Sequence, residues 1–139
     1  MTFSPLWALL QIMTNKTTFK FSSPNPDEYW LSERIYVCEL MNSPDEPELS
    51  LAQCRVPVGV TTQLHSLSIL EWYIIKSGTG LMEIDRQKIP MQAGDCVRID
   101  AGQSQRITNT GDCDLIFQSI CRPRFTPGSY TNLENEDES

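Results

Sequence analysis

The sequence predicts an all-β protein of one domain, folded as a β-sandwich or a β-barrel. From residue 33 onward, short apolar runs alternate with clusters of turn residues, so that predicted strands recur about every ten residues. No segment between them shows the 3.6-residue period of an amphipathic helix. The length of 139 residues is that of a single domain, and it allows a core to form without disulfide or metal cross-links.

Each predicted strand is an apolar run bounded by turn residues. A cluster at residues 42–47 contains two prolines and separates the first two strands. Asp85 and Arg86 form the turn of a predicted hairpin, and Pro123 and Pro127 end regular pairing. The predicted strands cover residues 34–41, 49–58, 60–65, 71–76, 81–84, 88–91, 95–99, 105–109 and 114–121.

The barrel domain is expected to span residues 28–126, with a further segment on either side. Residues 1–27 form an N-terminal extension or arm. Its apolar run at residues 6–10 is too short to span a bilayer and lacks the flanks of a secretory signal. This run is either a short helix packed on the barrel or part of an extension upstream of a true start at Met13. Residues 127–139 form a C-terminal segment whose acidic tail is expected to be disordered.

Charge and cysteine content exclude several classes of protein. The chain carries 11 basic and 18 acidic residues, a net charge of −7, which argues against a nucleic-acid surface and against an anionic membrane as partner. Five cysteines, an odd number without a CxxC pair, indicate neither a disulfide framework nor a zinc ribbon. They are expected to be small buried residues in a reducing, cytoplasmic compartment.

Glycines and polar residues recur at fixed offsets through the middle of the chain. The glycines permit tight turns that bring distant strands together. Residues two apart in a strand share a face, so Tyr73 lies on the same face as Glu71. Two sets of residues carry the pattern: Gly59, His65, Glu71 and Gly78 in the first, and Gly94, Gly102, Gln105 and Asn109 in the second.

This pattern resembles the two signature motifs of the cupin superfamily, G-x5-H-x-H-x3-E-x6-G and G-x5-P-x-G-x2-H-x3-N. Residues 28–134 are also similar to a group of small bacterial cupins, with matching segments at residues 40–45, 105–111 and 123–125. The resemblance implies a jelly-roll β-barrel with a polar site in its interior. It also implies a homodimer, because cupins are often dimers.

The resemblance places His65, Glu71 and Gln105 together inside the barrel, at positions that bind a metal ion in metal-dependent cupins. Here the second histidine position is Leu67, and glutamine replaces the histidine of the second motif. With one histidine in the chain, the two-histidine, one-carboxylate triad of non-haem iron oxygenases is not available. The remaining donors are an imidazole, a carboxylate and an amide, which would hold Mn²⁺, Fe²⁺, Ni²⁺ or Zn²⁺ weakly.

Three interpretations of the barrel interior stay open. In the first, a divalent metal held by His65, Glu71 and Gln105 acts on a small polar metabolite, as in an isomerase, lyase or dioxygenase; without metal, Glu71 would serve as a general base. In the second, the same residues form a hydrogen-bonded cluster that binds a small ligand without metal or catalysis. In the third, side chains simply fill the barrel. Tyr73 is expected to line the pocket and contact the substrate, or else to pack in the core.

Overall fold

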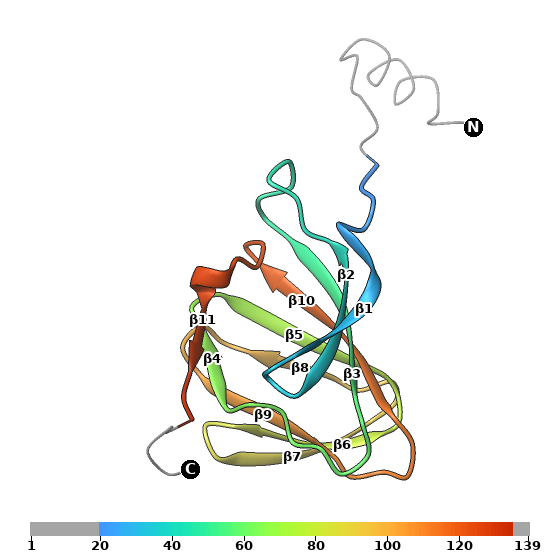
Figure 1. The fold of residues 1–139 in the computed structure, drawn as a ribbon. Helices are drawn as coiled ribbons and strands as arrows, with labels where there is room; N and C mark the ends of the chain where they lie inside the picture. The colour runs from blue at the N-terminus through green and yellow to red at the C-terminus, as the bar shows by residue number, and fades with distance from the viewer. Residues whose placement is uncertain (1–19, 135–139) are drawn as a thin grey trace, which may run out of the picture.

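The computed structural model describes residues 20–134, which form eleven β-strands and one short 3₁₀-helix in two facing sheets (Figure 1). Within this range, no helix is long and apolar enough to cross a membrane. The strands are β1 (Asn25–Leu31), β2 (Ile35–Met41), β3 (Ser50–Val56), β4 (His65–Leu67), β5 (Leu70–Ser77), β6 (Thr79–Ile84), β7 (Gln87–Gln92), β8 (Cys96–Ile99), β9 (Ser104–Asn109), β10 (Leu115–Arg122) and β11 (Tyr130–Asn132), and the 3₁₀-helix η1 (Pro127–Ser129) precedes β11.

The two sheets are antiparallel throughout and exchange strands, as in a jelly roll. One sheet has the order β1-β2-β3-β10-β5-β8, and the other has the order β11-β4-β9-β6-β7. The late strand β10 pairs with β3 on one side and β5 on the other. The predicted all-β jelly-roll barrel is therefore confirmed.

Alternation along the strands places one face of each sheet in a shared core. In β5 and β10, every second residue is buried, which matches the period of two in an extended strand. Phe117, Val56, Met82 and Leu115 are completely buried in this core. A second, smaller cluster of Leu67, Ile69 and Cys121 lies at the end of the barrel where β11 pairs with β4.

Two tight turns contain residues with positive φ angles, and the first of them is a motif glycine. Gly78 has φ +86°, and a Cβ atom there would lie 2.7 Å from the Asp114 carbonyl oxygen, so no other residue fits without movement of the backbone. The predicted hairpin joins β6 to β7 through Asp85 and Arg86, which have φ angles of 48° and 69°. Both residues of this two-residue turn are left-handed, as in a type I′ hairpin.

Most predicted strands are present, but the prediction for residues 60–65 was wrong. Only Thr61 forms an isolated bridge there, with Thr108, and strand β4 starts at His65. The backbone N–H of Thr62 donates to Ile107, that of Gln63 to Glu33, and that of Leu64 to the Glu134 side chain. These scattered acceptors prevent a regular ladder.

Strand pairing also extends beyond the expected barrel at both ends. Strand β1 begins at Asn25, inside the expected arm, and β11 lies in the expected C-terminal segment. Arg34 forms a salt bridge with Glu134 and ties this segment to the β1–β2 turn. The apolar run at residues 6–10, the alternative start at Met13 and the tail beyond residue 134 lie outside the described residues.

Candidate functional site

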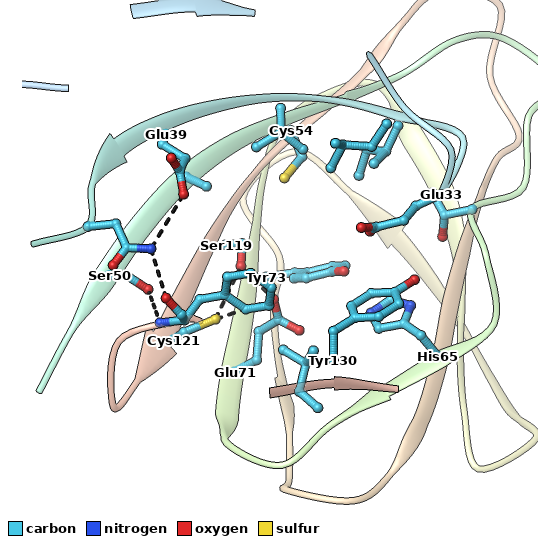
Figure 2. A pocket seen from close by; sticks show the side chains of 18 of the residues that line it. Glu33, Glu39, Ser50, Cys54, His65, Glu71, Tyr73, Ser119, Cys121 and Tyr130 are labelled. Atoms are coloured by element: carbon cyan, nitrogen blue, oxygen red, sulfur yellow. Dashed lines mark hydrogen bonds between the residues drawn. The ribbon is translucent and has the colours of Figure 1, made fainter. Parts of the chain in front are cut away.

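A cavity of about 120 Å³ opens between the sheets at the end of the barrel near β1, β4 and β11. This volume approaches the roughly 150 Å³ of a cavity that holds a benzene molecule. Its wall combines apolar side chains with carboxyl, hydroxyl, thiol and imidazole groups (Figure 2). The interpretation that side chains simply fill the barrel is therefore not supported.

Glu71 lies on β5 and is held by donors from two other strands. Gln105 Nε2 on β9 donates to Glu71 Oε1 at 2.8 Å, and Ser119 Oγ on β10 donates to Glu71 Oε2 at 2.5 Å. The side chain lines the cavity, but the residue is only 5% exposed. Burial raises the pKa of Glu71 above its usual range, although the hydrogen bonds from Ser119 and Gln105 oppose this shift. The protonated form of Glu71 is thus favoured more than in an exposed glutamate.

His65 opens β4 and faces the same cavity from the other sheet. Its ring stacks on Tyr130 of β11, with centroids 4.6 Å apart and planes 13° apart. Nδ1 lies 2.8 Å from the Gln63 carbonyl oxygen, an acceptor, so Nδ1 carries the hydrogen and Nε2 holds the lone pair. Nε2 has no hydrogen bond to any residue in the described part of the chain. Burial lowers the pKa of His65, which favours the neutral ring.

Tyr73 lines the cavity two residues after Glu71, on the same face of β5, as its spacing predicts. The residue is 5% exposed, and its ring stacks on Phe117 with centroids 4.2 Å apart. Its hydroxyl makes no hydrogen bond within residues 20–134 and points into the cavity (Figure 2). Buried tyrosine hydroxyls usually have a partner, so this group is available to a bound molecule.

Gln105 lies behind the cavity wall. It is the Cα partner of His65 in the β4–β9 pair, it is completely buried, and it is not among the residues that line the cavity. Its Nε2 positions Glu71, while Oε1 has no hydrogen-bond partner in the described chain. The structure therefore brings Gln105 to Glu71, as expected, but as a support for the carboxyl group.

Several polar residues in the wall were not singled out from the sequence, and Glu33 and Tyr130 are two of them. Glu33 comes from the β1–β2 turn, and Tyr130 comes from β11; both lie outside the two motifs. Burial raises the pKa of Glu33, and the neighbouring Tyr130 opposes this shift. The one proton of the Tyr130 hydroxyl is donated to Gln63 Oε1 at 2.7 Å. No sequence signal marks these positions, because they are far from His65 in sequence and come close to it only when the strands at the ends of the barrel pair.

The donors around the cavity do not fit a transition-metal ion. There is one imidazole, the position of the second family histidine is the apolar Leu67, and both Glu71 oxygens accept hydrogen bonds from the protein. Burial raises the pKa of the Cys121 thiol to about 12, so it is not the thiolate that binds metals. Across residues 20–134, no group of three or more His, Cys, Asp or Glu side chains is placed to hold a metal ion.

Glu71→Gln is expected to be more stable than the wild type, by an amount that grows as the pH rises. The raised pKa of folded Glu71 means that its contribution to stability is fully present below the unfolded pKa, near 4.5, and is lost as the pH rises through the folded pKa. Glutamine does not ionise, so the variant lacks this loss. The difference in urea midpoint between variant and wild type should grow from pH 4.5 to pH 8.

Glu83→Gln is the matched control, because it removes the same charge from the outer surface. Arg106 lowers the pKa of Glu83 through a hydrogen bond at 2.8 Å, so ionised Glu83 favours the folded state above pH 4.5. This variant should lose a little stability over the same pH range. A Glu71→Gln profile that runs parallel to the wild type would contradict the pKa shift of Glu71.

Comparison with known proteins identifies the family. A cupin domain model matches residues 53–121. An uncharacterized protein of Methanocaldococcus jannaschii is 39% identical over 86 residues, which cover 61% of this chain and 69% of that protein. The oxalate-binding protein of Thermotoga maritima is 34% identical over 70 residues, 50% of this chain and 58% of that protein. The chain belongs to the cupin family.

The solved structures extend the likeness to nearly the whole described chain. PAC13 of Streptomyces, crystallised with uridine, superposes with a TM-score of 0.70 and covers 89% of this chain and 98% of its own. A further PAC13 structure describes it as a nucleoside dehydratase. The sequence identity is 15%, so this likeness shows the fold alone. Cupins with this fold include both enzymes and binding proteins.

Proposed function

We propose that this chain is a metal-independent cupin that binds a small organic molecule in its barrel cavity and moves a proton on it, in a reaction of the isomerase or lyase type. The observation that carries the proposal is the state of His65. Its Nδ1 is engaged by the Gln63 carbonyl oxygen, and its Nε2 lone pair has no partner in the described chain. A neutral imidazole with a free nitrogen in the wall of a cavity is the arrangement of a general base.

Glu71 supplies the complementary acid. Burial favours its protonated form, and it lines the same cavity as His65. Proton transfer requires a base and an acid beside the same molecule, and neutral His65 and protonated Glu71 are such a pair. In an elimination, His65 Nε2 would take a proton from carbon, the electron pair would form the double bond, and Glu71 would protonate the leaving group. In an isomerisation, Glu71 would return a proton to another atom of the same molecule.

The dioxygenase alternative has less support, because the chain has one histidine and an iron triad needs two imidazoles. The dehydratase activity named for PAC13 agrees with elimination chemistry but adds no more than an analogy of fold. Our expectations of a homodimer and of a cytoplasmic location stay predictions.

A purely binding function is the second candidate, and one observation favours it. Both Glu71 oxygens are held by protein donors, so the carboxyl group must break or share a hydrogen bond in order to transfer a proton. In that case His65 and Tyr73 would only recognise the ligand.

The test begins with a thermal-shift screen of small polar metabolites, followed by proton NMR of each bound compound in D₂O. We expect the wild-type protein to replace a carbon-bound proton of its ligand with deuterium, before and after treatment with EDTA. Binding without exchange would support the binding function and rule out proton transfer. Stoichiometric metal in the purified protein that is lost in His65→Ala would overturn the metal-independent proposal.

A further inference from the structure

The cavity wall offers negative charge and no positive charge. Glu33 and Glu39 line the cavity together with Glu71, whose protonated form is favoured by burial, and among the described residues that line the cavity there is no lysine or arginine. Four of the seven arginines, Arg34, Arg55, Arg98 and Arg106, form salt bridges away from the cavity lining, with Glu28, Glu83, Asp100, Asp114 and Glu134. An anion inside the barrel would meet repulsion with no compensating cation, whereas a cation would meet attraction.

Glu33 is the carboxylate that most needs a partner from outside the protein. It is partly withdrawn from water, and it forms no salt bridge within residues 20–134. The neighbouring Tyr130 hydroxyl donates its one proton to Gln63 Oε1 at 2.7 Å. Figure 2 shows the Glu33 carboxylate directed into the pocket, across from Tyr73 and close to Tyr130 and His65. A partly buried charge without a counter-ion is costly, and a cationic ligand would offset that cost.

Aromatic rings provide a second feature that favours a cation. Tyr29, Tyr73, Phe125 and Tyr130 all line the cavity. The face of an aromatic ring attracts a cation, and this attraction is larger in a site from which water is removed. The combination of ring faces with carboxylates is how proteins recognise quaternary ammonium groups.

The unpartnered Tyr73 hydroxyl indicates independently that the cavity receives a polar molecule. Tyr73 is 95% buried, as its exposure is 5%, and its hydroxyl finds no acceptor or donor among the described residues. A ligand hydroxyl would complete this hydrogen bond. The volume of about 120 Å³ limits the ligand to about the size of a six-membered ring.

We infer that the ligand of this cavity is a small organic cation of the alkylammonium class that also carries a hydroxyl group. The ammonium group would pair with Glu33 and the aromatic rings, and the hydroxyl would bond to Tyr73. This inference rests on the proposed function, because it names the class of molecule that the same cavity takes. It also separates this chain from its relative in Thermotoga maritima, whose name describes the binding of a dianion.

Three isosteric probes that differ in charge test the inference in the full chain at constant ionic strength. Choline is the cation, 3,3-dimethylbutan-1-ol is its uncharged isostere, and 3,3-dimethylbutanoate is the anion. Titration calorimetry, with saturation-transfer NMR for weak binding, should show choline binding at least tenfold more tightly than the alcohol, and no binding of the carboxylate. Glu33→Gln should weaken choline at least tenfold and leave the affinity for the alcohol nearly unchanged.

Glu48→Gln is the matched control, because Glu48 is exposed and does not line the cavity. It removes the same charge and should leave choline binding unchanged; equal losses in both variants would indicate only a long-range effect of net charge and would overturn the inference. Tyr73→Phe should weaken choline and the alcohol alike. Equal affinity for choline and the alcohol, or no binding of any probe, would also overturn the cation inference. The deuterium-exchange test would still decide the proposed function in either case.

Discussion

Replacing His65 with glutamine is expected to slow ligand deuterium exchange by a factor of about 10²–10⁴, the usual contribution of a general base. Glutamine retains a polar group of similar reach, but its amide does not accept a proton at neutral pH. The Nε2 lone pair of His65 is the group that would take the proton, because Nδ1 is occupied by the Gln63 carbonyl oxygen. Proton NMR in D₂O at saturating ligand gives the rate directly.

The affinity of the ligand separates this effect from a loss of the site. We expect the dissociation constant of the His65→Gln variant to change much less than the exchange rate, since the cavity wall stays intact. Ser66→Ala is a suitable control on the same strand, because Ser66 is half-buried and does not line the cavity. An exchange rate in His65→Gln equal to that of the wild type would remove His65 from the reaction.

Phe117→Ala is expected to lower the free energy of unfolding by about 3–5 kcal/mol. Phe117 is completely buried at the centre of β10, where it is the Cα partner of Cys54 on β3 and of Ile75 on β5. Alanine would leave a void that the two flanking strands cannot fill. Urea denaturation followed by circular dichroism measures the loss.

The same substitution should weaken ligand binding, because Phe117 supports the Tyr73 ring at a centroid distance of 4.2 Å. Ile120→Ala is the comparison on the same strand. Ile120 is half-buried on the opposite face, so its removal should cost about 1–2 kcal/mol and leave the ligand affinity unchanged. Similar losses of stability in the two variants would mean that Phe117 is not the centre of the core.

The sequence predicted the middle of the fold well, because the turns and strands there depend on residues that are close in sequence. The turn at Gly78 needs a positive φ, and a glycine stands there. The hairpin around Asp85 and the alternation of β5 and β10 depend on residues that are close in sequence. Local patterns of this kind report on a strand or a turn without knowledge of its partners.

The ends of the barrel were not predictable in the same way. Strand β11 has three residues and exists because it pairs with β4, more than sixty positions earlier. Residues 60–65 begin with the β-branched side chains of Val60, Thr61 and Thr62, which favour a strand, but their hydrogen bonds go to three different segments. Pairing of this type is decided by the partners, and short strands carry little signal of their own.

The same distinction between local and long-range features applies to the site. The sequence by itself determined the shared face of Glu71 and Tyr73, because a period of two is a local property of a strand. The resemblance of its motif spacing to the cupin motifs implied the barrel and the position of His65 opposite these two residues. Only the tertiary structure decided that Gln105 supports Glu71 from behind the wall, that Nδ1 of His65 is occupied, and that Glu33 and Tyr130 complete the cavity. Alternation shows whether a side chain points inward, but its depth, its partners and its charge neighbours depend on strands that meet only when the barrel closes.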